Sequence, residues 1–154
     1  MKYQNVIKVI TAAVWLSATC AHADESRAIH AEQSVERRII ALDENGFETV
    51  RYEPATLVKP GDYLRYVLSY ENRLEHPAED IVLVMPVPGA MRFIPGSVLP
   101  SDVPYQVSYD KGASFIPTPA ETPEGKWVTH IRWTFDRDLK VDEDGQVSFA
   151  AILK

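Results

Sequence analysis

Short runs rich in valine, isoleucine, tyrosine and phenylalanine are interrupted about every ten residues by glycine, proline, asparagine or aspartate along most of this chain. Such spacing is typical of short strands joined by turns, and two sheets of such strands packed face to face form a β-sandwich. No segment shows the longer periodicity of an amphipathic helix. The pattern therefore predicts an all-β protein with one sandwich domain of about seven to nine strands.

Turn residues divide the chain into eight expected strands. The clearest alternation falls in residues 63–72, where every second residue is large and apolar: Leu64, Tyr66, Leu68 and Tyr70. We expect these four side chains to face the core, because successive side chains of a strand point to opposite faces. The other expected strands are residues 35–42, 47–52, 81–85, 105–109, 113–116, 127–135 and 146–153.

Three details refine this prediction. Residues 81–85 form a continuous apolar run, which is typical of a strand covered on both sides. Asn45-Gly46 tolerates positive φ and favours a tight reversal after the first strand. Asp110-Lys111-Gly112 lies between two expected strands and predicts a hairpin.

The first 23 residues have the pattern of a secretory signal peptide. Lys2 and Lys8 supply positive charge, residues 9–18 are apolar, and an Ala-His-Ala sequence ends at position 23. The apolar run has about half the ~20 residues that span a bilayer, and small residues suit signal peptidase. We therefore expect cleavage before Asp24 and a periplasmic or secreted protein.

The expected organisation is a signal peptide (1–23), a flexible N-terminal segment (24–34) and a sandwich domain (35–154). Segment 24–34 is polar and charged, which favours a flexible leader. Removal of the signal peptide takes away two lysines and makes the chain more acidic than its full-length net charge of −6.

Cys20 is the only cysteine, and it lies within the signal peptide. The exported chain is therefore expected to have no disulfide, no thiolate metal site and no cysteine nucleophile. In an alternative interpretation, residues 16–20 form a lipoprotein box and Cys20 becomes the acylated first residue. Acylation would anchor the protein to a membrane.

The charge balance limits the classes of partner. The chain has 16 lysines and arginines against 22 aspartates and glutamates, with no long basic run. Nucleic acids and anionic lipid surfaces are bound through basic patches, so neither is an expected partner.

Three sequence blocks occur in a characteristic order. The first joins Val-Lys-Pro-Gly-Asp (58–62) to Tyr-Val-Leu-Ser-Tyr-Glu-Asn (66–72), and the second runs from Pro77 through Pro-Val-Pro (86–88) to Ser97. The third joins residues 133–139 to Gly-Gln-Val-Ser-Phe (145–149). Together they resemble the DUF11 family, immunoglobulin-like repeats of bacterial exported and cell-surface proteins.

The resemblance covers most of residues 47–154 and implies an immunoglobulin-like β-sandwich. The chain departs from the family pattern in two respects. Met85 stands where family members commonly have aspartate, and this chain has one copy instead of a tandem array. The resemblance implies a fold and a location but no catalytic residue.

Potential metal ligands are sparse. His30, His76 and His130 are far apart in the sequence, so the pattern predicts no metal site. Met85 and Met91 with His76 would offer soft donors for Cu(I). Met85 ends an apolar strand, however, and we expect it to pack in the core.

Acidic residues offer two further candidate sites. Asp142, Asp144 and Gly145 resemble the start of a calcium loop, but no glutamate completes it, so we expect a solvated acidic turn. Asp136 and Asp138 lie close enough in sequence for acid–base chemistry, although such pairs are common on exposed strands. No Gly-x-Ser-x-Gly sequence is present. We therefore expect no catalytic residue, no cofactor and no enzymatic activity.

Four aromatic residues near the end of the chain form the remaining candidate surface. Exposed aromatic rings on a sheet stack on sugars or hold protein partners. We expect Trp133 to be buried, and we assign the candidate interaction surface to Tyr105, Tyr109 and Trp127, with core packing as the alternative.

The last expected strand alternates to its end, with Val147, Phe149, Ala151 and Leu153 on one face. It is either a closing strand paired within its own sheet or lies near an edge that adds a partner strand.

The sequence as a whole predicts an exported, non-enzymatic structural or protein-interaction module of the bacterial cell envelope. The expected partner is another envelope protein or a second copy of the chain. The alternative function is a periplasmic binding protein for a small ligand, either a carbohydrate or a metal.

Overall fold

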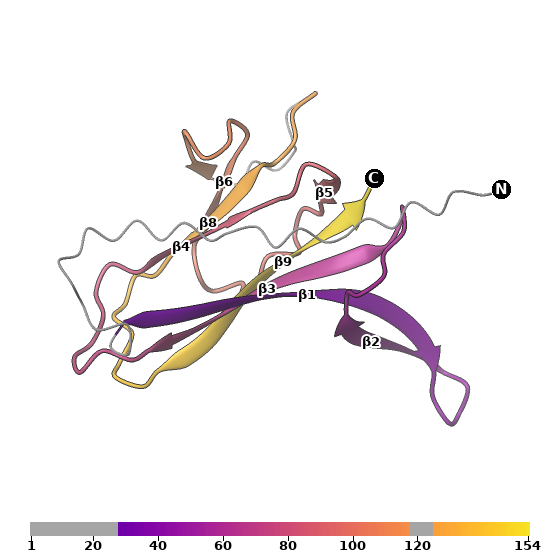
Figure 1. Ribbon diagram of the computed structural model, residues 1–154, viewed down its shortest axis with the longest axis horizontal. Helices are drawn as coiled ribbons and strands as arrows, with labels where there is room; N and C mark the ends of the chain where they lie inside the picture. The colour runs from indigo at the N-terminus through magenta and orange to yellow at the C-terminus, as the bar shows by residue number, and fades with distance from the viewer. Residues whose placement is uncertain (1–27, 118–124) are drawn as a thin grey trace.

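The computed structural model describes residues 28–117 and 125–154 (Figure 1). The strands are β1 (Ile29–Leu42), β2 (Glu48–Pro54), β3 (Tyr63–Asn72), β4 (Val82–Pro86), β5 (Met91–Phe93), β6 (Tyr105–Ser108), β7 (Ile116–Pro117), β8 (His130–Thr134) and β9 (Asp144–Leu153). They form two antiparallel sheets, ordered β2-β1-β3-β9-β5 and β4-β8-β6-β7. No helix occurs within the described ranges, and the predicted all-β, sandwich-like architecture is confirmed.

The core lies between the two sheets. All four residues predicted to face inward from β3 are buried, and the predicted core positions of Met85 and Trp133 are confirmed at 0% exposure. The ring of Tyr66 on β3 stacks on Phe149 of β9, with centroids 4.9 Å apart and planes 5° from parallel. Burial raises the pKa of the Tyr66 hydroxyl to about 12.

The predicted signal peptide and Cys20 lie outside the described residues. Residues 28–117 and 125–154 contain no apolar helix of membrane-spanning length.

The first strand begins earlier than the sequence predicts. β1 starts at Ile29 and pairs with β3 from Ile29 to Arg37, so the expectation of a flexible segment is wrong for residues 29–34. Ala31 and Val35 pack against the core, but Gln33 lies between them. This small and polar inward face hides the alternation on which the prediction depended.

Two further strand predictions need correction. In β4 only alternate residues are buried, and Val82 is 43% exposed, so the expectation of a strand covered on both sides is wrong. The three-residue strand β5 is absent from the prediction, because it is short and lies among prolines and glycines. The β3 bounds agree with the prediction.

β9 lies inside its sheet. It pairs with β3 from Asp144 to Ile152 and with β5 from Ala151 to Leu153. The interpretation as a closing strand paired within its own sheet is confirmed, and the edge of the sheet near β9 is formed by β5.

Candidate functional site

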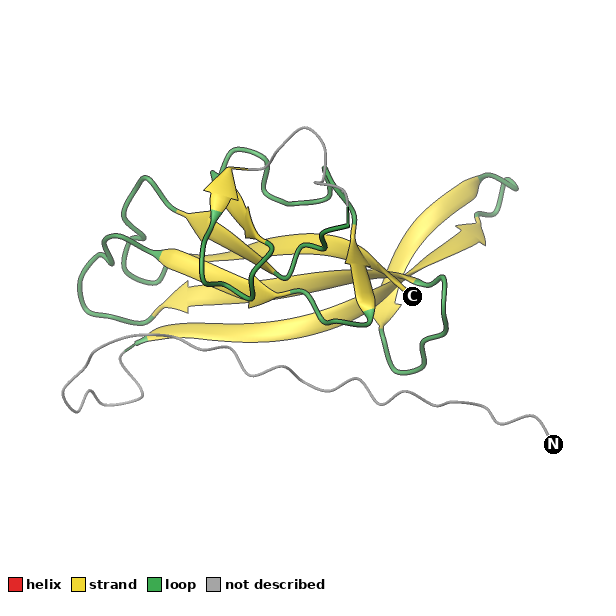
Figure 2. Ribbon diagram, turned by 90° about the horizontal axis from the view of Figure 1, so that it is seen from above, coloured by secondary structure: helices red, strands yellow, loops and turns green. Residues whose placement is uncertain are grey.

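The hairpin of β1 and β2 projects beyond the rest of the sandwich (Figure 2). β1 pairs with β3 only as far as Arg37, whereas its pairing with β2 continues to Leu42. Within the described chain, no residue from 38 to 54 belongs to the hydrophobic core. This part of β1 therefore has a partner strand on one side and no second sheet above it.

One face of this hairpin is both apolar and exposed. Residues directly opposite each other on paired strands share a face. The pairs on this face are Arg38–Tyr52, Ile40–Val50 and Leu42–Glu48, and we name these six residues the hairpin face. Ile40, Leu42 and Val50 are 58%, 67% and 57% exposed. Single exposed aliphatic side chains are ordinary, but a contiguous group marks an interaction site.

Stacked arginines hold the base of the hairpin to the sandwich. The Arg65 guanidinium lies 3.7 Å from the ring centroid of Tyr52, and its Nη2 lies 2.5 Å from Oε2 of Glu36. Arg38 lies over Tyr63 of β3 at 4.0 Å. These contacts fix the direction in which the hairpin projects.

A compact turn closes the tip. Asp43 Oδ1 accepts hydrogen bonds from the backbone N–H groups of Asn45 and Phe47, both at 2.9 Å. Gly46 has φ +82°, so the predicted tight reversal is confirmed, with positive φ at the glycine of the pair. Phe47 is 69% exposed and extends the apolar surface at the tip.

Charge differs between the two ends of the hairpin face. The exposed carboxylates of Glu44 and Glu48 lie at the tip, whereas the exposed guanidinium of Arg38 lies at the base. Among the described residues, Glu48 has no ion-pair partner. The hairpin face thus consists of an aliphatic centre between an acidic end and a basic end.

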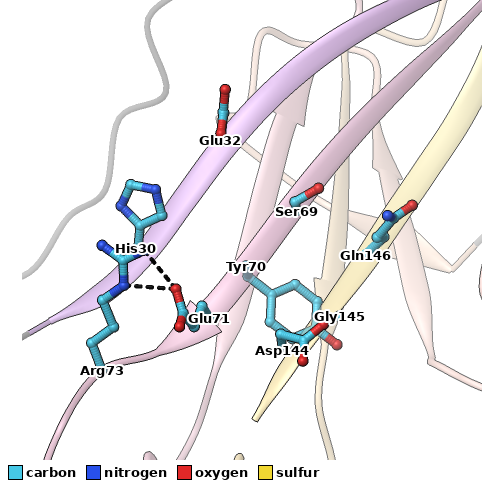
Figure 3. Close-up of a pocket in the computed structure, with 9 residues that line it drawn as sticks. All are labelled: His30, Glu32, Ser69, Tyr70, Glu71, Arg73, Asp144, Gly145 and Gln146. Atoms are coloured by element: carbon cyan, nitrogen blue, oxygen red, sulfur yellow. Dashed lines mark hydrogen bonds and ion pairs between the residues drawn. The ribbon is translucent and has the colours of Figure 1, made fainter. Parts of the chain in front are cut away.

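A depression of about 390 Å³ lies at the other end of β1 (Figure 3). His30, Glu71 and Asp144 line it together with Arg73. Arg73 donates from Nε to Glu71 Oε2 at 2.6 Å, and its Nη2 lies at the same distance from that oxygen. The pairing neutralises one of the acids and leaves a polar surface of mixed charge.

The three histidines considered as metal ligands lie in different parts of the structure. Residues 28–117 and 125–154 hold no group of three or more His, Cys, Asp or Glu side chains that could bind a metal ion. His30 and His130 lie on different sheets. Met85 and Met91 are buried in the core, whereas His76 is on an exposed loop, so the structure does not assemble the copper ligands.

His130 packs beneath the turn between β6 and β7. A Cβ added at Gly112 would lie 3.7 Å from its ring. Burial lowers the pKa of His130, and the nearby Asp110 carboxylate opposes this shift. Hydrogen bonds from Ser114 and Ser108 hold the pKa of Asp110 well below its usual range. β6 and β7 pair in the predicted hairpin, with positive φ at Lys111 and Gly112, but the second strand begins at Ile116 and not at residue 113.

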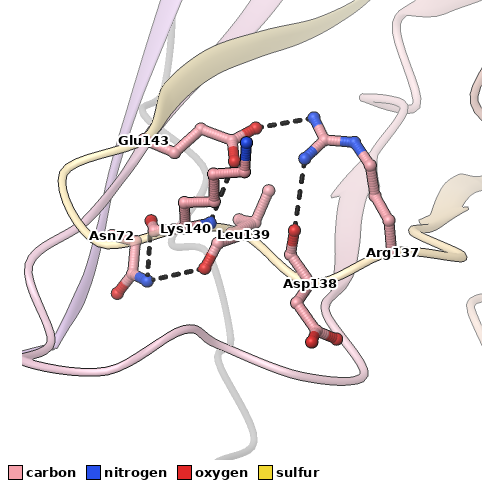
Figure 4. A network of polar contacts seen from close by, with 6 residues as sticks. All are labelled: Asn72, Arg137, Asp138, Leu139, Lys140 and Glu143. Atoms are coloured by element: carbon pink, nitrogen blue, oxygen red, sulfur yellow. Dashed lines mark hydrogen bonds and ion pairs between the residues drawn. The ribbon is translucent and has the colours of Figure 1, made fainter.

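Asn72 connects two loops, 73–81 and 135–143, at the end of the sandwich opposite the hairpin (Figure 4). Its side chain is fully buried and donates from Nδ2 to the carbonyl oxygens of Leu139 at 2.9 Å and Lys140 at 3.0 Å. Its Oδ1 accepts from the Leu74 N–H at 3.0 Å. The sequence analysis assigned no role to this residue, although an asparagine ending a strongly alternating strand is a signal for such a link.

The candidate acidic sites are parts of exposed turns. Asp136 and Asp138 are both exposed. Arg137 between them pairs with Glu143, with Nη2 and Oε1 2.6 Å apart, and this contact lowers the pKa of the Glu143 carboxyl. Asp142 adopts φ +58° in the turn before β9. The arrangement stabilises a turn and gathers no pair of acids around a cleft.

The three aromatic residues of the predicted interaction surface lie in different environments. Tyr105 and Tyr109 are partly buried and pack against the core, as the alternative interpretation expects. Trp127 is 52% exposed, and the Lys154 ammonium lies 5.0 Å from its ring centroid.

The sequence analysis did not identify the hairpin face. A usable signal was present in residues 39–42, Ile-Ile-Ala-Leu, which are apolar on both alternating faces. A strand with only one buried face needs apolar residues only at every second position. The additional apolar residues at the alternate positions therefore indicated a second contact surface.

Comparison with family models, curated proteins and solved structures finds no match to this chain.

Proposed function

We propose that this chain is an exported, non-enzymatic protein-interaction module of the bacterial cell envelope, built as an immunoglobulin-like sandwich. The observation that carries the proposal is the exposed aliphatic centre of the hairpin face, on a hairpin that projects from the sandwich. The signal-peptide pattern of residues 1–23 and the DUF11 resemblance of residues 47–154 support a location in the envelope.

The sandwich acts as a rigid base for this contact. β1 is one continuous strand that is paired with β3 in its first part and forms the hairpin in its second part. The hairpin face is therefore held in place before a partner binds, which lowers the entropy cost of association. Burial of its aliphatic side chains supplies the driving force, at about 25 cal/mol per Å² of apolar surface.

Export is tested by intact mass spectrometry of the protein from envelope fractions of its native host. A soluble species that begins at Asp24 is the expected result. A species acylated at Cys20 in the membrane fraction would support the lipoprotein alternative. An unprocessed chain in the cytoplasm would refute export.

The contact surface is tested by placing a photo-crosslinking amino acid at Val50 in cells of that host. The matched control is the same probe at Val141, which is 42% exposed on a loop distant in sequence from the hairpin. We expect defined crosslinked products at position 50 and none of them at position 141. Identical patterns at both positions would contradict a role for the hairpin face.

The exposed ring of Trp127 favours carbohydrate binding as a second candidate function, because sugars stack on exposed indoles. Titration with soluble glycan fragments, followed by tryptophan fluorescence, tests this function. A saturable change that Trp127→Ala removes would support it, and an unchanged spectrum would refute it.

A further inference from the structure

We propose that the partner of the hairpin face is a second copy of this chain, bound face to face and antiparallel about a twofold axis. This inference rests on the proposed function, because it names the partner of the same surface. Symmetric pairing of one patch with itself is the commonest form of protein assembly.

The order of residues along the hairpin face is self-complementary. From base to tip, the cross-strand pairs are Arg38–Tyr52, Ile40–Val50 and Leu42–Glu48. A twofold axis through the central pair places the base of each hairpin against the tip of the other. Opposite charges then meet at both ends of the interface, and aliphatic side chains meet at its centre.

The contacts at each end follow from the chemistry of these side chains. Arg38 stays stacked on Tyr63 and presents its exposed guanidinium at the end where Glu48 of the second copy arrives. Glu48 has no ion-pair partner among the described residues of its own chain. Tyr52, which is 36% exposed beside the Arg65 guanidinium, adds ring surface at the base of the hairpin face. A parallel arrangement would instead bring like charges together.

Edge-to-edge pairing of β2 with its symmetry mate fits the exposed side chains less well. Such pairing would extend the sheet through backbone hydrogen bonds. It would, however, leave Ile40, Leu42 and Val50 in water, because they point out of the sheet. Only face-to-face packing covers all three side chains.

The size of the hairpin face sets the expected strength of association. Two short strands contribute few side chains, which places the contact near or below the lower end of the roughly 1,200–2,000 Å² of stable interfaces. We therefore expect a reversible dimer with a dissociation constant in the micromolar range.

The test is sedimentation equilibrium of the protein purified after expression of its full chain. Ile40→Glu should weaken association roughly tenfold or more, because it places charge at the apolar centre. Val141→Glu is the matched control, since it adds the same charge at another exposed aliphatic position and should leave association unchanged. Thermal unfolding of each variant verifies that it is folded.

A charge exchange tests the antiparallel arrangement. Glu48→Arg and Arg38→Glu should each weaken self-association roughly tenfold. An equimolar mixture of the two variants should associate again, because every contact between positions 38 and 48 then joins opposite charges. Failure of the mixture to associate would overturn the antiparallel arrangement.

A wild-type protein that stays monomeric at about 200 µM would overturn the dimer, since weaker association falls outside the expected range. The crosslinking experiment separates the two proposals. Products at position 50 that contain a different protein, from a monomeric chain, would leave the proposed function standing without the dimer. A monomeric chain with no products specific to position 50 would refute both.

Discussion

The first half of β1, up to Arg37, pairs with β3 and turns Ala31 and Val35 toward the core, whereas the second half pairs with β2 alone. Ile40 and Leu42 in this second half are more than half exposed. The two halves form one strand with the same alternating geometry. Alternation decides which face a side chain lies on, and the presence of a second sheet decides whether that face is buried.

The largest expected change in the free energy of unfolding comes from substitution of Trp133, which lies in the packed region and is 0% exposed. Trp133→Ala should lower the free energy of unfolding by about 3–5 kcal/mol, because it removes a large ring and leaves a cavity. Trp133→Phe should cost less, since it keeps a ring and removes an indole N–H that lacks a hydrogen-bond partner among the described residues. Urea denaturation measures both, and a loss below about 1 kcal/mol for the alanine variant would place Trp133 outside the core.

A smaller difference in stability is expected between alanine substitutions of two asparagines, one in each region. Asn72→Ala should cost about 1–3 kcal/mol, because it removes a fully buried amide that donates to the carbonyl oxygens of Leu139 and Lys140. Asn45→Ala in the exposed hairpin turn should change stability by less than about 0.5 kcal/mol. Equal costs in urea denaturation would show that the two ends of the molecule are equally well packed.

The pH dependence of stability should be linked to the packed region through His130. Burial lowers its folded-state pKa below the ordinary value of 6.5, so the unfolded chain binds this proton more readily. The resulting stability is fully present above pH 6.5 and is lost as the pH falls below that value. The stability that comes from the lowered pKa of Asp110 is lost only when the pH falls below about its ordinary pKa of 3.8.

Urea midpoints between pH 7.5 and 5.5 measure this effect. His130→Gln should flatten the profile in that range, whereas His30→Gln on the exposed start of β1 serves as the control. An unchanged slope in the His130 variant would assign the pH dependence to other groups.

The smallest effect is expected in the hairpin itself. Ile40→Ser and Leu42→Ser should each change the free energy of unfolding by no more than about 0.5 kcal/mol, because both side chains are already exposed. The measurement should be made well below the concentration at which the chain self-associates. A loss above about 1.5 kcal/mol would mean that these residues stabilise the monomer.

The sequence predicted β3 and the core accurately, because Leu64, Tyr66, Leu68 and Tyr70 alternate without interruption and a clear turn precedes them. Residues 29–34 escaped prediction because long-range pairing with β3 stabilises a stretch whose inward side chains after Ile29 are small or polar. Strand formation there depends on a neighbour that local periodicity does not contain.

The candidate site was harder to predict. The sequence placed Ile40 on a strand, but its exposure depends on how far β3 extends beside β1, which is a property of register. Asn72 shows the same limit, because two of its hydrogen-bond acceptors, Leu139 and Lys140, lie more than sixty residues away along the chain. The DUF11 resemblance and the export signal remain predictions.

β9 is the ninth strand in chain order, yet it lies between β3 and β5. While the first eight strands emerge from the ribosome, β3 lacks one of its two neighbours and the Phe149 ring that stacks on Tyr66 does not yet exist. Closure of the sandwich must therefore wait for residues 144–153, and the dependence on such distant pairings is typical of slow-folding β-proteins. Until these residues are available, β3 keeps one unpaired edge and one side of the core is missing.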